Sequence, residues 1–342
     1  MEEKRIKIVL QGYSLCCQNK AGGAQSRIRK ICSLLNKTDC VESSLFSTFE
    51  TDLSDADVLH IFLLNSENYS LINYAKRNKK KVVISAIASL SCGRQVDLHR
   101  TIFSKLPILT TYKMMIESAQ MADCIIVETP KEYDFIKKHY KISPDRLKII
   151  PNGVDEINYF GKEFFDVLGK ECKYVLHVGR FDENKNQLNV IKAMRGSGIH
   201  VVFIGGSDGQ GYYELCQKEA EGYDNIHFLG WLESDSQLLK SAYAYADTFV
   251  MPSFNETFGL VLLEAGIAGA KLVISNTLPI LDHEVFRTCR TFNPASVDDI
   301  KMSVIETFNA EKEGEFKNQL RNTFSWDRVI SQHIECYRSV LK

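Results

Sequence analysis

Two features that would place a protein outside the cytoplasm are missing from this sequence. Its first residues, MEEKRIKIVLQGYS, are acidic where a signal peptide is basic, and their apolar run covers only residues 8–10, so we expect no export signal. No segment approaches the roughly 18 to 20 uninterrupted apolar residues of a membrane-spanning helix. We therefore expect a cytoplasmic chain, with any membrane contact peripheral and on the inner face.

Cysteines with the spacing of zinc or redox sites are missing as well. The ten cysteines are scattered singly apart from the adjacent Cys16 and Cys17, and none forms C-x-x-C. They are typical of reduced thiols, and we predict no bound metal and no cofactor. Nothing in the sequence indicates a nucleic-acid partner.

The composition that is present fits a globular protein of two domains. The 342 residues are 44% hydrophobic and 25% charged, too long for one average core. Residues 1–160 hold 23 Lys and Arg against 18 Asp and Glu, a charge of +5, and the remainder holds 19 against 25, a charge of −6. The first half includes Lys-Arg-Asn-Lys-Lys-Lys at 76–81, which either meets anionic lipid headgroups or forms a solvated helix end.

Short β-branched runs alternate with longer amphipathic stretches along the whole chain. This rhythm indicates parallel sheets built by strand-helix-strand crossovers, and therefore an α/β fold of two doubly wound domains, 1–160 and 161–324. The strands are predicted at Ile6–Leu10, Val58–Leu63, Val82–Ser85, Cys124–Val127, Tyr174–Val178, His200–Ile204, Ile226–Phe228, Thr248–Met251 and Leu272–Ser275.

The last segment, 325–342, has the pattern of an amphipathic helix. Ser325 is a suitable N-cap, and the apolar residues that follow share one helical face: Trp326, Val329, Ile330, Ile334, Tyr337, Val340 and Leu341. We expect this face to pack against another part of the protein.

Two glutamates bracket a predicted helix start at residues 251–264, MPSFNETFGLVLLE. A helix that begins near Phe258 or Gly259 directs its free N–H groups toward an anion such as a diphosphate. Glu264 lies about five residues further, roughly 7–8 Å along the axis, where a carboxylate can accept hydrogen bonds from ribose hydroxyls. Glu256 lies just outside the helix, and the alternative is a pair of unrelated surface or capping glutamates.

A second loop, VGRFDENKN at 178–186, brings two cations to another strand end. Arg180 and Lys185 are suited to neutralising a diphosphate, unless they pair with the local acids Asp182 and Glu183. A third loop, GGSDGQG at 205–211, does not spell G-x-G-x-x-G, which gives little support to a nicotinamide or flavin site.

Together these clusters resemble glycosyltransferase family 4, retaining transferases also called glycosyl transferases group 1. The matching elements are Gly22-Gly23-Ala24, Pro151-Asn152-Gly153-Val154-Asp155, Gly179-Arg180-Phe181 with Lys185, Phe228-Leu229-Gly230, the residues from Glu256 to Glu264, and the terminal helix. The resemblance implies two Rossmann-like domains facing a cleft, the GT-B architecture. Residues 1–160 would bind the acceptor, residues 161–324 the nucleotide-sugar, and the helix 325–342 would cross back onto the N-terminal domain.

The resemblance also implies roles for individual residues. Arg180 and Lys185 would bind the donor phosphates, Glu264 the ribose, and Glu256 the donor sugar. The stretch Thr257-Phe258-Gly259-Leu260 would line the sugar-diphosphate site, and the Gly22-Gly23 loop would close the cleft. Trp231 lies where the family commonly holds the nucleobase, although a core tryptophan is the alternative. Arg180, Lys185 and Glu256 would carry catalysis.

One departure from the family pattern concerns the first half. After the strand where relatives often carry a histidine, this chain reads Val-Val-Ile-Ser-Ala-Ile-Ala at 82–88. His99 either substitutes as an acceptor-site residue or lies on a helix surface. Thr129 stands where relatives tend to have serine.

The sequence therefore predicts a retaining, metal-independent, hexosyltransferase-like enzyme. Its donor would be a UDP- or GDP-sugar and its acceptor a saccharide or lipid-linked molecule, in the assembly of cell-surface polysaccharide or glycoconjugate at an anionic membrane surface. The pair Asp55-Ala56-Asp57 has the Asp-x-Asp pattern of metal-dependent transferases, but it precedes a predicted strand and is expected to face solvent. The alternatives are a non-hydrolysing nucleotide-sugar epimerase and a catalytically silent nucleotide-sugar-binding subunit.

Overall fold

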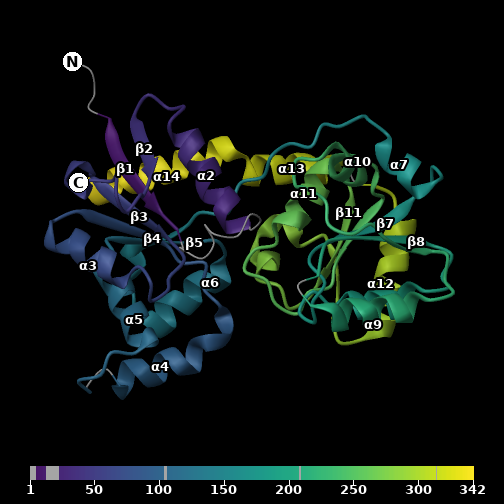
Figure 1. Ribbon diagram of the computed structural model, residues 1–342, viewed down its shortest axis with the longest axis horizontal. Coiled ribbons are helices and arrows are strands. Elements are labelled where there is room, and N and C mark those ends of the chain that lie inside the picture. The colour runs from purple at the N-terminus through teal and green to yellow at the C-terminus, as the bar shows by residue number, and fades with distance from the viewer. Residues whose placement is uncertain (1–4, 13–22, 104–105, 208, 313) are drawn as a thin grey trace. The chain divides into compact units, whose positions relative to one another are not determined.

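The computed structural model describes residues 5–12, 23–103, 106–207, 209–312 and 314–342 (Figure 1). The chain divides into two compact units. Unit 1 comprises residues 1–152 and 326–342, and unit 2 comprises residues 153–325. Unit 2 thus begins at Gly153 rather than at residue 161, and the chain returns to unit 1 after Ser325.

Unit 1 is built on a parallel six-stranded sheet in the order β2-β1-β3-β4-β5-β6. Its strands are β1 (Ile6–Gln11), β2 (Val41–Leu45), β3 (Val58–Phe62), β4 (Lys81–Ser85), β5 (Cys124–Val127) and β6 (Leu147–Ile149). Its α-helices are α2 (Gly23–Leu35), α3 (Tyr69–Arg77), α4 (Gly93–Thr101), α5 (Thr111–Met121), α6 (Pro130–Phe135) and α14 (Trp326–Leu341).

Both faces of this sheet are covered because its strands are apolar on both sides. Ile8 and Leu10 of β1 pack with α2 and α14 in one core, whereas Val9 packs with α3, α4 and α5 in the other. The apolar face predicted for the terminal helix is the face that enters the first core, where Val329 and Tyr337 are fully buried. The last helix of the chain therefore completes the unit that contains the first strand.

Unit 2 repeats the plan with a parallel sheet in the order β12-β11-β10-β7-β8-β9. Its strands are β7 (Tyr174–Val178), β8 (His200–Ile204), β9 (Ile226–Phe228), β10 (Thr248–Met251), β11 (Lys271–Ser275) and β12 (Arg290–Phe292). Its α-helices are α7 (Glu163–Leu168), α8 (Gln187–Met194), α9 (Gln210–Ala220), α10 (Gln237–Tyr245), α11 (Leu260–Ala268), α12 (Val297–Asn309) and α13 (Gly314–Phe324). The two sheets confirm the predicted α/β fold class with two doubly wound halves.

Three strands escaped prediction, and all three are edge strands. β2, β6 and β12 carry the sequences Val-Glu-Ser-Ser-Leu, Leu-Lys-Ile and Arg-Thr-Phe. An edge strand has a neighbour on one side only and buries less of its surface, so its sequence holds polar residues that break the apolar run.

A buried polar cluster lies under α14 in unit 1. His60 of β3 places Nδ1 2.8 Å from the hydroxyl of Tyr337 and Nε2 2.9 Å from Oγ of Ser85. His333 is fully buried beside it, and burial together with the charge of Arg27 lowers its pKa to about 4, although its Nδ1 lies 3.0 Å from the carbonyl of Val329. Burial likewise holds the pKa of His60 well below its usual range.

These histidines predict a loss of stability in acid. A histidine whose pKa is depressed in the folded state stabilises the fold fully above its unfolded pKa of about 6.5, and this contribution is lost as the pH falls toward 4, because the unfolded chain then binds more protons. Between pH 7 and pH 5, His333 alone should lower the free energy of unfolding by about 2 kcal/mol. Urea unfolding of the wild type and of His333→Leu at both pH values measures this, and an equal loss in the two proteins would contradict it.

Candidate functional site

The candidate site of unit 2 lies at the carboxyl edge of its sheet, where the strand order reverses. β10 pairs directly with β7, through Thr248 with Val175 and Phe249 with Leu176. β8 and β9 continue the sheet on one side of this pair, and β11 and β12 on the other. The loops that leave the ends of β7 and β10 therefore diverge, and such reversal points are where doubly wound sheets bind ligands.

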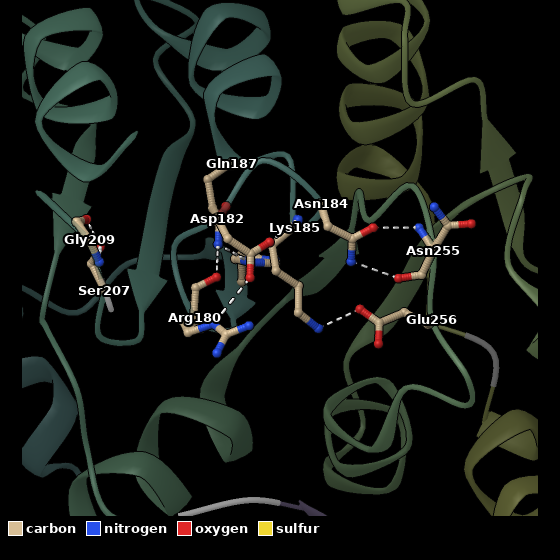
Figure 2. A network of polar contacts seen from close by, with 10 residues as sticks. Arg180, Asp182, Asn184, Lys185, Gln187, Ser207, Gly209, Asn255 and Glu256 are labelled. Carbon is tan, nitrogen blue, oxygen red and sulfur yellow. Dashed lines mark hydrogen bonds and ion pairs between the residues drawn. The ribbon is translucent and has the colours of Figure 1, made fainter. Parts of the chain in front are cut away.

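Asn184 joins these two loops. Its side-chain Nδ2 donates to the carbonyl of Asn255 at 2.8 Å, and its Oδ1 accepts from the backbone N–H of Asn255 at 3.0 Å. The N–H of Phe254 also donates to the carbonyl of Asn184 at 2.8 Å. Figure 2 shows the carboxamide of Asn184 facing Asn255 and bonding its backbone as a neighbouring strand would. These three bonds fix the position of one loop relative to the other.

This arrangement of the two loops brings Lys185 and Glu256 together. The ammonium Nζ of Lys185 contacts Oε1 of Glu256 directly (Figure 2). The two side chains are 21% and 14% exposed, so the pair is largely withdrawn from water while remaining open to a ligand. Two residues that the sequence placed in separate clusters thus form one charged pair, 71 positions apart along the chain.

Arg180 lies in the same loop and is more exposed, at 58%. Its Nε bonds Oδ2 of Asp182 at 3.2 Å, and Oδ1 of Asp182 accepts from the backbone N–H of Lys185 at 2.9 Å. The local pairing considered as an alternative therefore holds for Arg180, whereas the side chain of Lys185 reaches Glu256 rather than Asp182 or Glu183.

The backbone between these cations and α8 is fixed by two side-chain amides. Asn186 has the left-handed φ of 60° that asparagine tolerates, and its buried Nδ2 donates to the carbonyls of Pro252 and Pro294 at 3.1 and 2.8 Å. Gln187 donates to the carbonyl of Arg180 at 2.8 Å. These bonds fix the path of the loop between Arg180 and α8.

Helix α11 begins at Leu260, one residue after the predicted range of Phe258 or Gly259. Gly259 is its N-cap, with a φ of 95° that favours glycine, and no side chain caps the helix. Phe258 is buried, with its ring against His283 and Phe324, so only its backbone can face a ligand. Thr257 is exposed.

Glu264 lies on the second turn of α11 and is held by a tyrosine. Its Oε2 accepts from the hydroxyl of Tyr243 in α10 at 2.8 Å. Burial raises the pKa of Glu264, the nearby charge of Asp155 adds to this, and the hydrogen bond from Tyr243 opposes it. The carboxylate that the resemblance assigns to ribose is therefore fixed in orientation.

A hollow of about 540 Å³ lies at the ends of β8 and β9. Gly205, Gly206, Tyr213 and Gly230 are among the residues that line it. A Cβ on Gly205 would lie 2.0 Å from the carbonyl oxygen of Gly179, so only glycine fits there. Trp231 follows this wall and is 59% exposed, which excludes the alternative of a core tryptophan.

The candidate residues of unit 1 are less closely grouped. Gly22 lies outside the described residues, and Gly23 is the first residue of α2. His99 lies half-buried on α4, with Nδ1 2.8 Å from the carbonyl of Gln95 and its ring stacked on Phe103 at 4.7 Å. Asp57 precedes β3, where its Oδ2 accepts from the N–H of Lys7 at 2.9 Å.

The end of β4, where relatives often carry a histidine, is held by a buried glutamate in this chain. Glu132 accepts from the backbone N–H groups of Ala88 and Glu128 at 2.7 and 2.6 Å. Burial raises the pKa of Glu132 to about 7. Ile87 has a φ of 46°, a strained value for a β-branched residue. Thr129 caps α6 by accepting from the N–H of Glu132 at 3.1 Å.

Sequence reasoning missed the residues that position the charged groups. Asn184, Asn255 and Tyr243 are uncharged and match no motif. Only the preference of asparagine for turns could have pointed to the first two. Within the described ranges, the structure contains no group of three or more side chains suited to hold a metal ion. Nor does any described helix have the length and apolarity needed to span a membrane.

Known families match both units of the chain. Residues 162–316 match the family model Glycosyl transferases group 1, and residues 44–156 match the model Glycosyltransferase Family 4. An uncharacterized 41.2 kDa protein of the cps region of Klebsiella pneumoniae is 28% identical over 65% of this chain and 63% of its own length. A D-inositol 3-phosphate glycosyltransferase of Corynebacterium glutamicum is 26% identical over 64% of this chain and 58% of its own. The matches thus span about three fifths of these relatives.

Solved structures of the same fold match nearly the whole chain. HepE from Anabaena in complex with UDP has a TM-score of 0.73 at 16% identity and covers 98% of this chain and 100% of its own. A glycosyltransferase from Rickettsia africae also has a TM-score of 0.73, at 13% identity, and covers 99% of both chains. These similarities confirm the predicted fold, two Rossmann-like halves of the GT-B type.

The bonds of Asn184 predict a local effect of its removal. Asn184→Ala deletes two solvent-exposed hydrogen bonds between the loops, so the free energy of unfolding should fall by about 1 kcal/mol and the amides of residues 252–259 should exchange faster with deuterium. Asn189→Ala, which deletes a single bond to the carbonyl of Pro294, is the control and should leave that segment unchanged. Unchanged exchange in Asn184→Ala would show that the Asn184 side chain does not hold residues 252–259 in place.

Proposed function

This chain belongs to the glycosyl transferases group 1 family, and we propose that it transfers a sugar from a nucleotide-sugar to a saccharide or lipid-linked acceptor, with retention of the anomeric configuration. The observation that carries the proposal is the pairing of Lys185 with Glu256 at the strand-order reversal, beside the N-terminus of α11. The family matches do not favour the epimerase or the silent binding subunit.

The diphosphate of the donor would be bound by cations and by a helix N-terminus together. Lys185 and Arg180 supply the positive charge, and the backbone around Gly259 supplies N–H groups. When a phosphate oxygen takes the place of the Glu256 carboxylate at the ammonium, Glu256 is released to accept hydrogen bonds from the donor-sugar hydroxyls. The ion pair thus keeps both groups in place for the donor.

The nucleoside would extend from this diphosphate along unit 2. Glu264, oriented by Tyr243, would accept hydrogen bonds from the ribose hydroxyls. The hollow beside Gly205 and Gly206 would hold the base, with Trp231 at its rim as an exposed aromatic surface. The stretch from Thr257 to Leu260 would line the sugar-diphosphate site. In unit 1, the Gly22-Gly23 loop and His99 remain proposed contacts.

The proposed reaction needs no protein base. The acceptor hydroxyl attacks the anomeric carbon on the face from which the diphosphate leaves. The bond between that carbon and the phosphate oxygen breaks with its electron pair going to the diphosphate, and a diphosphate oxygen takes the acceptor's proton. Arg180 and Lys185 stabilise the negative charge that develops on the leaving group, so their contribution is electrostatic and positional.

We further propose that the donor is a UDP- or GDP-sugar and that the protein works in polysaccharide or glycoconjugate assembly on the cytoplasmic side. The support comes from similar proteins: one lies in a cps region, one is named an O-antigen chain mannosyltransferase, and one solved neighbour holds UDP. A thermal-shift panel of UDP-, GDP- and ADP-sugars identifies the donor, because a ligand that binds only the folded state raises its stability by mass action.

Replacing Lys185 tests the proposed role of the charged pair. With the donor chosen by the panel and an acceptor extract, Lys185→Ala should lower kcat about 100-fold or more, because one fixed charge on the leaving group is lost. Lys192→Ala is a matched control on the exposed surface of α8 and should keep the wild-type rate. A near-normal rate in Lys185→Ala would remove Lys185 from the mechanism.

Metal independence is tested separately. Because leaving-group stabilisation is assigned to Arg180 and Lys185, transfer should proceed at the same rate in buffer containing EDTA and in buffer with added Mg²⁺ or Mn²⁺. Loss of activity in EDTA, with recovery on adding either cation, would overturn this part of the proposal.

A further inference from the structure

Exposed apolar side chains are concentrated in one short segment of unit 1. Of the sixteen large hydrophobic residues that are exposed in the described part of the chain, five lie within residues 98–109. They are Leu98, Ile102, Leu106, Ile108 and Leu109, with exposed fractions of 43% to 61%, and we call them the α4–α5 patch. Pro107 is exposed between them, so residues 106–109 form a continuous exposed apolar run.

The folding of unit 1 does not account for this patch. Helix α4 turns Gly93 and Val96 inward, and Val96 packs in the core of the sheet. Leu98 and Ile102 are four positions apart and face outward together. Figure 1 shows α4 at one end of unit 1, beyond α5. Runs of exposed apolar residues are rare on soluble proteins unless they meet a partner.

The surroundings of the patch are positively charged. Arg94 on α4 is exposed, as are Lys137 and Lys138 on the π-helical turn Ile136–Tyr140. That turn is joined to α4, because Nδ1 of His139 lies 2.8 Å from Oδ2 of Asp97. Asp97, the acidic residue of α4, is therefore already engaged by its neighbours. Asp134 is exposed one turn before Lys137 and Lys138, so Arg94 and these two lysines outnumber the exposed acidic residue on this flank.

Three of the five basic residues in the run at 76–81 are engaged by unit 1 itself. Lys76 bonds Oδ2 of Asp123 at 2.7 Å, Lys80 donates to the carbonyl of Ser54, and Lys81 lies 3.9 Å from Oδ1 of Asp123. These lysines tie the end of α3 and the start of β4 to the body of unit 1. Of the two readings of this run, the structure favours the helix end over the lipid-binding surface.

We propose that the α4–α5 patch is the surface on which this protein docks to an anionic lipid membrane. The apolar side chains enter the boundary between headgroups and acyl chains, and Arg94, Lys137 and Lys138 lie against the anionic headgroups. Apolar contact and charge reinforce each other, and the small size of the patch makes the binding reversible. A second copy of the chain or another protein on this surface is a competing outcome.

Flotation of the full-length protein with vesicles tests the proposal. The wild type should bind vesicles of phosphatidylcholine with phosphatidylglycerol more strongly than phosphatidylcholine alone, and high salt should release it. The double variant Ile108→Ser with Leu109→Ser should bind at least about tenfold more weakly, because its apolar area is removed. Val167→Ser with Leu215→Ser, at exposed apolar positions of unit 2, is the matched control and should bind like the wild type.

The charge is tested by a second pair of variants. Lys137→Glu with Lys138→Glu should weaken binding to the anionic vesicles roughly twentyfold or more, since each basic residue near such a surface contributes about fivefold. Lys79→Glu, an exposed lysine of the basic run, should change binding little. A loss in Lys79→Glu of half the double variant's loss on a logarithmic scale would assign binding to the net charge of unit 1 and overturn the proposal.

A fluorescence measurement on a further variant distinguishes weakened docking from misfolding of the serine variants. Leu109→Trp adds an indole at the patch, and its emission should shift to the blue on adding anionic vesicles, whereas Val167→Trp should not respond. Absence of the shift, or a wild-type dimer that the serine variant converts to monomer, would overturn the proposal. Lys185→Ala should bind vesicles like the wild type, so this inference and the proposed transfer activity fail separately.

Discussion

The hydrogen-bonded contact between β7 and β10 is the constraint from which the candidate site follows. Strands that are far apart in sequence become neighbours at the centre of the second sheet, and because they are parallel their carboxyl ends meet at one edge. The chain then leaves these ends in opposite directions. Two loops that lie about seventy residues apart in the sequence are brought together, and the pairing of Lys185 with Glu256 depends on that meeting.

The central strands were predictable because burial on both faces leaves a clear apolar run, and nine strands, the edge strand β9 among them, were located within a residue. The edge strands β2, β6 and β12 were not, since partial exposure admits polar residues such as Glu42, Lys148 and Arg290. The start of α11 at Leu260 was close to the expected position because Gly259 marks it.

The site was predictable in its residue types but not in its pairings. Arg180, Lys185, Glu256 and Glu264 stand out because they are charged residues at strand ends and helix starts. That Lys185 meets Glu256 depends on the carboxamide of Asn184, and that Glu264 is held in place depends on a tyrosine of another helix. Uncharged side chains that act by geometry leave no signature in a single sequence, since nothing in their type distinguishes them from ordinary loop or core residues.

The return of α14 to unit 1 has a consequence for how the protein is made. During synthesis, part of one apolar face of the first sheet stays uncovered until α14 has been translated, because α2 covers only the rest of that face. All of unit 2 is translated before α14, so this part of the face stays uncovered during that time. Unit 1 therefore cannot complete its core until α14 has been translated, and the uncovered apolar surface is open to chaperones or to aggregation in the interval.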